Sequence, residues 1–439
     1  MNHRRSSTRV GAIMATALAI GTLSACANGS TTSDDSAASR EFTYWSMFKM
    51  GEPGQVALAT IIDEFEKDTG ITVDAQWVGR DVLTKLQPTL STSPAADLID
   101  RPLWAVESVM VPSGTVADLE PVLDMEIPGS DETVRDVIPE TYLEVARSKD
   151  GAQVVIPWTM TSYDIWYDSA RFPDLVSTTD LTWDRFVEVL DDSRTLGAPL
   201  ALDADILGYS AYWYNNAVLH TMGPGAMNKA AGDKTGKTWD ESGYRDAADR
   251  IQQLVAGGYF AEGYNASKFP AIQQKWASGE ANFILNGSWL PGEAAPNAAE
   301  GFEFASIPFP ADEPDSKYAA TTAYGWVIPS KSTNPGPAEQ FIAYAYGKER
   351  AQAYADETSV ISARADVTES AAVASAAATL ENADKLVLDD DGISQSYGGD
   401  WSTKVYQPLV AQLLTGGLDA EKFIAEIKQQ TVSYWELNQ

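Results

Sequence analysis

Cysteine and histidine are almost absent from this sequence of 439 residues. The one cysteine is Cys26, and the two histidines are His3 and His220. A single cysteine forms no internal disulfide, and this small set excludes a zinc site of histidine and cysteine and a Cys–His nucleophile pair. The patterns Gly-x-Ser-x-Gly and His-Glu-x-x-His are also missing, so the sequence carries neither of these hydrolase signatures.

Basic residues and long apolar runs are scarce as well. Lysine and arginine total 31 against 62 acidic residues, a net charge of −31. A surface this acidic argues against binding to nucleic acid or to anionic lipid. The one apolar stretch near the N-terminus, residues 10–23, is shorter than the roughly 20 residues that cross a bilayer.

The N-terminus has the features of an export leader. Three arginines precede the apolar stretch, which ends in Leu23-Ser24-Ala25-Cys26 and resembles the lipobox of bacterial lipoproteins. We expect residues 1–25 to be removed, Cys26 to be lipidated and residues 26–40 to form a flexible tether. Removing the leader, with three arginines and no acid, takes the net charge from −31 to −34. The predicted location is the outer face of the cell membrane.

The remaining chain alternates strand and helix patterns. Residues 41–45 predict a strand, residues 54–68 a helix with apolar residues on one face, and residues 71–77 a second strand. A strand–helix–strand unit implies parallel strands and a right-handed crossover. The pattern predicts the α/β class, and the length of the chain predicts more than one domain.

One stretch, residues 279–289, predicts a binding position. Gly279 ends a helix, residues 283–285 are a short buried strand, Asn286-Gly287 is a turn pair, and Ser288 can cap a new helix. Trp289 then lies at the carboxyl end of a strand, where open α/β sheets bind ligands. Packing in the core is the alternative for this side chain.

Earlier in the chain, residues 153–156 predict a strand that Pro157 stops, and residues 164–167 predict another strand.

Several short motifs, in order along the chain, resemble those of family 1 extracellular solute-binding proteins of ABC importers, the maltose-binding-protein-like group. The motifs are Ile71–Asp74, Lys85-Leu86, Pro94–Asp97, Gly151–Pro157, Trp166–Asp168, Thr182–Phe186, Trp276–Ala281, Asn286–Trp289, Ile307-Pro308, Tyr324–Ile328 and Pro337–Ile342. Asp168 and Asn282-Phe283 depart from the family pattern.

The resemblance implies a two-lobed, periplasmic-binding-protein-like (type II) fold with a hinge and a ligand cleft between the lobes. It implies residues 41–158 as the first part of lobe 1 and 159–303 as the first part of lobe 2. Residues 304–346 would return to lobe 1, and residues 347–439 would complete lobe 2 with C-terminal helices. A closed, liganded monomer would deliver its solute to the permease subunits in the membrane.

Aromatic residues at strand ends, with a few charged neighbours, are the expected ligand contacts. Aromatic faces stack on sugar rings, and charged groups hydrogen-bond hydroxyls. The candidates are Trp45, Phe48, Lys49, Asp97, Arg101, Trp104, Trp158, Tyr163, Tyr212, Trp213, Asn286, Trp289, Tyr324, Trp326, Arg364 and Trp401. Strand alternation can turn Trp213 or Trp326 inward instead. The predicted ligand is a neutral carbohydrate, an oligosaccharide in the leading interpretation.

Two motifs are weaker, and two other function classes stay open. Residues 232–238 approach a phosphate loop but lack its first glycine, and residues 389–392 lack the ligand spacing of a calcium loop, so a solvated acidic loop is expected there. No metal and no cofactor is expected.

One alternative to the carbohydrate-binding protein is a surface-anchored enzyme that degrades carbohydrate with paired carboxylates. A binding protein for a non-sugar solute is the other.

Overall fold

The computed structural model describes residues 40–176, 178, 181–311 and 317–438. The predicted leader, Cys26 and nearly all of the tether lie outside these residues. Within the described part of the chain, none of the helices combines the length and the apolar character needed to cross a membrane.

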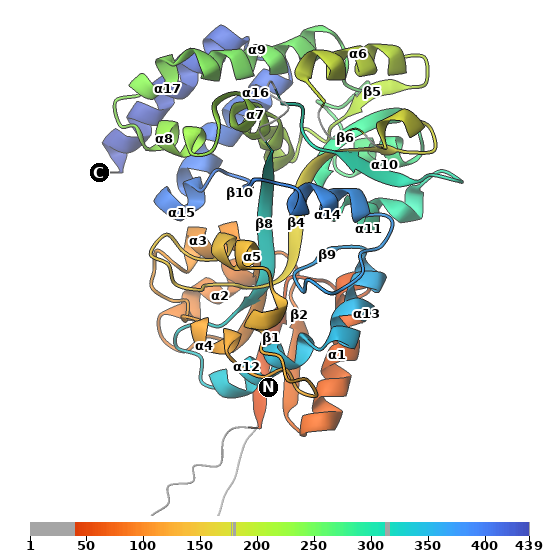
Figure 1. Ribbon diagram of the computed structural model, residues 1–439. Helices are drawn as coiled ribbons and strands as arrows, with labels where there is room; N and C mark the ends of the chain where they lie inside the picture. Colours follow the sequence, from red (N-terminus) through yellow and green to blue (C-terminus); the bar gives the residue numbers. More distant parts are fainter. Residues whose placement is uncertain (1–39, 177, 179–180, 312–316, 439) are drawn as a thin grey trace, which may run out of the picture. The chain divides into compact units, whose positions relative to one another are not determined.

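Ten strands form one mixed sheet that runs through both halves of the described body (Figure 1). Along its main path the order is β2-β1-β3-β8-β4-β6-β5, with β10 on β8 and with β7 and β9 on β4. The strands are β1 (Glu41–Ser46), β2 (Thr72–Trp77), β3 (Leu98–Pro102), β4 (Ile156–Asp168), β5 (Ala198–Ala201), β6 (Ala281–Gly287), β7 (Phe304–Ile307), β8 (Tyr318–Val327), β9 (Ile361–Ser362) and β10 (Lys385–Leu388).

The long strand β4 belongs to both halves of the sheet. Its first part pairs antiparallel with β8, from Ile156 to Ser162, and its second part pairs antiparallel with β6, from Tyr163 to Tyr167. We call the half with β1, β2, β3 and β8 lobe 1 and the half with β5, β6 and β7 lobe 2. Figure 1 shows β4 and β8 running side by side between the two lobes.

The helices cover the sheet in two groups. Those around lobe 1 are α1 (Pro53–Thr69), α2 (Val82–Leu90), α3 (Leu103–Val109), α4 (Glu120–Leu123), α5 (Glu140–Val145), α12 (Pro335–Ala345), α13 (Lys348–Thr358) and α14 (Ala374–Glu381). Those around lobe 2 are α6 (Trp183–Ser193), α7 (Leu207–Met222), α8 (Ala226–Gly232), α9 (Ser242–Ala256), α10 (Ala271–Ala277), α11 (Leu290–Ala294), α15 (Ile393–Tyr397), α16 (Gln407–Leu414) and α17 (Ala420–Leu437).

Two large apolar clusters lie beneath these helices. One joins β1 and β3 with α1 and α12, where Phe65 and Phe341 meet edge to face with ring centres 5.3 Å apart. The other joins α7, α9, α16 and α17, where Tyr214 and Phe423 are 4.8 Å apart. The first cluster extends to α10 and α11 of lobe 2, so the lobes are in apolar contact on that side.

Several local predictions are confirmed, while those for Pro157 and for Asn286-Gly287 are wrong. β1, α1 and β2 form the predicted parallel unit, and Thr182 caps α6 by accepting a hydrogen bond from Arg185 N–H. Pro157 does not stop a strand, because β4 begins at Ile156 and continues through it. The register of β4 against β8 shifts between Pro157 and Thr159, and a bulge of this kind tolerates a residue without an N–H. Asn286-Gly287 is also not a turn but the end of β6.

Candidate functional site

Four aromatic side chains form a continuous wall on lobe 2, which we call the aromatic wall. Tyr163 of β4 lies 4.5 Å from Tyr212 and 5.8 Å from Trp289, measured between ring centres. Tyr209 precedes Tyr212 by one helical turn on α7, and the two rings are 6.0 Å apart. Tyr163 is buried, whereas the other three are partly exposed. The wall therefore presents three partly exposed aromatic rings beside the buried ring of Tyr163.

The sequence around β6 explains the position of Trp289. The indole folds back over the end of β6, where a Cβ added to Gly287 would lie 2.0 Å from the ring atom Cζ3. Only glycine leaves that space. Ser288 does not cap α11 as predicted, because Trp289 is the residue before the helix. Ser288 instead donates its N–H to Ser162 O at 3.0 Å and accepts from Ser162 N–H, which ties the segment to β4.

Lobe 1 presents two arginines and the aromatic ring of Phe48. Arg101, at the end of β3, donates to Arg80 O at 3.1 Å, while its Nε is buried with no hydrogen-bond partner among the described residues. Arg80 donates to Met47 O at 2.8 Å and pairs with Glu52, and its guanidinium lies 5.5 Å from the Phe48 ring centre. Burial lowers the pKa of Arg101 from its ordinary value, as expected for a desolvated cation.

Tyr324 of β8 connects this lobe to the aromatic wall. Burial raises the pKa of the Tyr324 hydroxyl to about 12, with Arg101 opposing the rise and Asp389 adding to it. The same hydroxyl acts on the pKa of Tyr163, Tyr209 and Tyr212, so it lies within electrostatic reach of all three.

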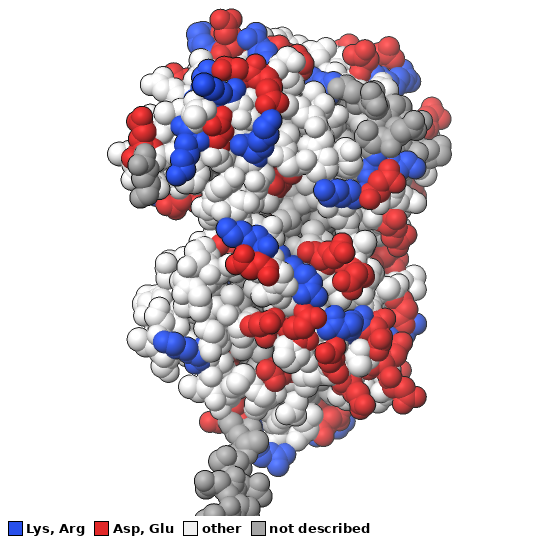
Figure 2. Space-filling model, turned by 60° about the vertical axis from the view of Figure 1, so that its left-hand side comes forward, with Lys and Arg blue, Asp and Glu red and all other residues white. Residues whose placement is uncertain are grey.

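Glu293 of α11 provides a second connection across the lobes. Burial raises its pKa, a hydrogen bond from Gln273 lowers it, and Arg80 and Glu52 of lobe 1 act on it in opposite directions. Glu293 is nevertheless exposed to solvent. Glu293 therefore lies at the solvent-exposed boundary between the lobes, and the molecular surface narrows between them (Figure 2). We define the cleft by the aromatic wall on lobe 2 and by Tyr324, Arg101 and Arg80 on lobe 1.

The cleft is suited to holding a ligand without covalent chemistry. Aromatic faces bind flat apolar surfaces such as the CH faces of sugar rings, and the charged groups bind hydroxyls. Among the described residues, no group of three or more histidine, cysteine, aspartate or glutamate side chains has the geometry to hold a metal ion.

Four of the predicted tryptophans are core residues, which corrects the prediction. Trp213 and Trp401 lie fully buried in the cluster of lobe 2, and Trp326 and Trp158 lie in the cluster of lobe 1. Trp213 follows Tyr212 on α7 and is turned about 100° from it, toward the core. Trp326 lies under Phe341 of α12, with ring centres 5.5 Å apart.

Asp97 is also used internally. It lies before β3, at the opposite end of the strand from Arg101, and accepts hydrogen bonds from Thr43 N–H at 3.0 Å, Ser332 Oγ at 2.7 Å and Asn334 N–H at 3.0 Å. Burial acts to raise its pKa, but these donors lower it overall. The carboxylate holds the loop before α12 onto β1, so the prediction that it binds ligand is wrong.

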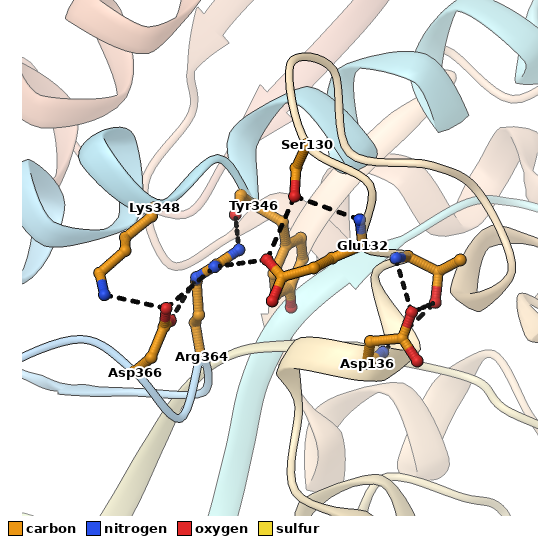
Figure 3. Close-up of polar contacts among 8 residues, drawn as sticks. Ser130, Glu132, Asp136, Tyr346, Lys348, Arg364 and Asp366 are labelled. Atoms are coloured by element: carbon orange, nitrogen blue, oxygen red, sulfur yellow. Dashed lines mark hydrogen bonds and ion pairs between the residues drawn. The ribbon is translucent and has the colours of Figure 1, made fainter.

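Arg364 is the centre of an ion network in lobe 1 (Figure 3). It donates to Tyr346 O at 2.8 Å and Glu132 at 3.0 Å and forms a bidentate pair with Asp366, which Lys348 also contacts at 3.0 Å. Its side chain is 3% exposed. Its partners Tyr346, Glu132 and Asp366 lie outside the cleft as defined above, which corrects the predicted ligand role.

The remaining candidates lie in varied surroundings, and their ligand roles stay predictions. Trp45 is partly buried on β1, with an Nε1 that has no hydrogen-bond partner among the described residues. Lys49 is exposed beside Gly79, and Trp104 is 42% exposed on α3. Asn286 is fully buried, and its Oδ1 accepts the N–H of Gly287.

Sequence reasoning missed Arg80, Tyr209, Glu293 and Asp389. Tyr209 was detectable, because it lies three residues before Tyr212 and therefore on the same helical face. The two acids carry no local signal, since their roles depend on how α11 and the loop after β10 meet the cleft.

The acidic loop is not the solvated loop that was predicted. Asp390 accepts from Gly392 and Ser394 N–H groups at the start of α15, and Asp391 accepts from Gly225 and Met227 N–H groups at the start of α8. The near phosphate loop is a closed turn instead, because Asp233 accepts the N–H groups of both Thr235 and Thr238.

The protein has two lobes, strands that pass between them, and a cleft that aromatic and charged groups line. These features define a two-lobed ligand-binding protein. More particularly, the chain belongs to the bacterial extracellular solute-binding protein family, whose sequence profile matches residues 60–382. The fold and family predictions are thereby confirmed.

Individual relatives are distant. The diacetylchitobiose binding protein NgcE of Streptomyces coelicolor is 21% identical over 273 residues, which are 60% of this chain and 57% of that protein. The solute receptor AcbH, which has an exclusive preference for β-D-galactopyranose, has a TM-score of 0.71 at 14% identity over 90% of this chain and 98% of its own. A Bacillus licheniformis sugar transporter in complex with stachyose has a TM-score of 0.66 at 18% identity. The match covers 89% of this chain and 98% of that protein. These two structures support the fold.

Proposed function

We propose that this protein is the substrate-binding component of an ABC importer and that it captures a neutral carbohydrate, an oligosaccharide, between its lobes. The observation that carries the proposal is the aromatic wall of Tyr163, Tyr209, Tyr212 and Trp289 facing Tyr324 and Arg101 across the cleft. Several aromatic faces in a row match several pyranose rings, and tyrosine hydroxyls and a guanidinium match their hydroxyls.

The proposed work is capture and release, without catalysis. Closure is driven by the difference in ligand affinity between the closed and open arrangements of the lobes. The ligands of these relatives, diacetylchitobiose, β-D-galactopyranose and stachyose, support the carbohydrate class and differ in size. They do not select one sugar for this chain.

A ligand screen on the mature chain tests the proposal. The panel contains stachyose, raffinose, diacetylchitobiose and galactose, with digalacturonate, dipeptides and polyols as other classes, and the readouts are melting temperature and calorimetry. A ligand that binds only the native state raises the melting temperature by mass action. We expect at least one neutral glycan to do so. A shift with the other classes alone overturns the carbohydrate assignment, and release of shorter sugars at catalytic rates overturns the binding-only role.

We further propose that Cys26 carries a lipid anchor and that the permease subunits are the partner at the membrane. The support is the lipobox-like sequence Leu23–Cys26 and the extracellular family assignment. Mass spectrometry of the membrane fraction should detect a diacylated Cys26, and Cys26→Ser should release the protein from the membrane. An unmodified N-terminal peptide that begins before Cys26 overturns this assignment.

A further inference from the structure

Asp389 differs from the other two carboxylates of its loop in its hydrogen bonding. Asp390 and Asp391 each accept two or more backbone N–H groups at helix starts. The Asp389 oxygen Oδ1 is buried and has no hydrogen-bond partner among the described residues. A buried, unpaired carboxylate oxygen is costly, so this position requires a reason.

The backbone at Asp389 is held from two sides. Its N–H donates to Thr321 O of β8 at 2.9 Å, and its carbonyl accepts from Asn215 Nδ2 of α7 at 2.8 Å. Both anchors belong to elements that line the cleft. These two hydrogen bonds fix the backbone of Asp389 between β8 and α7.

The Asp389 carboxylate lies within electrostatic reach of two tyrosines of the aromatic wall and of Tyr324. The Tyr163 hydroxyl is its neighbour and lowers its pKa, while the charge of Asp389 raises the pKa values of Tyr212 and Tyr324. The residue is partly exposed. Among the described residues, the charged groups that act on the pKa of Asp389 do not include an arginine or a lysine. Asp390 raises this pKa, and Asp389 in turn raises the pKa of Glu107 of α3.

We propose that Asp389 accepts hydrogen bonds from ligand hydroxyls at the base of the cleft and excludes ligands that carry a carboxylate there. The inference rests on the proposed carbohydrate function and sharpens it, since it selects uncharged, hydroxyl-rich ligands over acidic sugars. A hydroxyl group of the ligand can donate a hydrogen bond to this partly exposed carboxylate, whereas a uronate would place a second negative charge against it.

Protonation follows from the same geometry. Burial, with Asp390 adding to it, raises the pKa of Asp389 to about 8 in the unliganded protein. A ligand that donates hydrogen bonds favours the ionised carboxylate and lowers this pKa. Ligand affinity should therefore rise with pH up to about 8, with a proton released on binding at neutral pH.

Asp389→Asn tests the proposal, with Asp384→Asn as the matched control, because Asp384 is exposed and its change removes the same charge. Calorimetry with the neutral glycans of the panel, and with galactobiose against digalacturonate, gives affinity and selectivity from pH 6 to 8.5. We expect Asp389→Asn to weaken glycan binding about 10- to 100-fold, the effect of a hydrogen bond to a charged group. The rise of affinity with pH and the preference for the neutral disaccharide should be lost as well. Glu107→Gln should keep that rise, which separates the two acids.

Two results overturn the inference, and they are distinguishable. If a glycan binds the wild type and Asp389→Asn with equal affinity while the variant melts at a lower temperature, Asp389 is structural. A water in the small cavity that Asp389 shares with Asn215 and Asn216 then supplies its partner. If no glycan binds the wild type, the proposed function itself fails, and the inference with it.

Discussion

Replacing Trp289 separates ligand binding from folding. The indole is partly exposed and packs against Tyr163 with ring centres 5.8 Å apart. A fully buried tryptophan costs about 3–5 kcal/mol when cut to alanine. We expect Trp289→Ala to cost less than about 2 kcal/mol of unfolding free energy, because the indole is not fully buried.

Its effect on binding should be larger. An aromatic anchor that a ligand covers contributes about 2 kcal/mol or more, which is about 30-fold in Kd. Calorimetry with the glycan that binds the wild type gives this ratio, and urea unfolding of the unliganded protein gives the stability. A loss of about 3–5 kcal/mol in stability with an unchanged Kd would show that Trp289 is a core residue, and would refute its proposed role in ligand binding.

Gly287→Ala tests the same position without removing the ring. The new Cβ would lie 2.0 Å from the indole, so the indole must move, while the backbone at Gly287 lies outside the left-handed region. We expect a loss of affinity close to that of Trp289→Ala. Gly208→Ala, in the first turn of α7 with no atom near its added Cβ, is the control and should leave binding unchanged.

Arg364→Ala should cost about 3 kcal/mol in urea unfolding, since a buried guanidinium with several charged partners is lost, and should leave glycan affinity unchanged; a fall in affinity alone would restore the ligand role. Glu107 is 2% exposed, and burial, with Asp390 adding to it, raises its pKa to about 8 from an unfolded value near 4.5. Between these values the folded state holds the extra proton, so this group makes stability fall as pH rises from about 5 to 8. Glu107→Gln should remove that fall, and the gap in unfolding free energy between variant and wild type should widen toward pH 8. A gap that stays constant with pH would contradict the assignment.

Local patterns predicted the elements that depend on near neighbours. The β1–α1–β2 unit followed from apolar spacing, and β6 followed from its short apolar run. The order of motifs along the chain predicted the family and with it the two lobes. Pro157 misled, because a single sequence does not reveal that a bulge in β4 absorbs the missing N–H.

The cleft was less predictable because packing from distant segments decides which aromatics remain accessible. Tyr324 and Trp326 share one face of β8 by alternation, yet α12 covers only Trp326 with Phe341. Trp158 lies at the bulge of β4, where alternation itself fails. Asp389 differs from these tryptophans, because its acidic neighbours in the sequence predict an exposed surface loop. In the structure, hydrogen bonds from its backbone to β8 and α7 hold it near the cleft.

The place of β8 in the sheet has a consequence for how the chain is made. β8 (Tyr318–Val327) lies between β3 and β4, although β3 leaves the ribosome more than two hundred residues earlier. Until β8 is synthesised, β3 has an open edge that can pair with other chains. Pairing over such a separation also folds slowly. Lobe 1 is therefore completed late in synthesis, and a chain that stops before Tyr318 cannot close the sheet of the lobe in which it began.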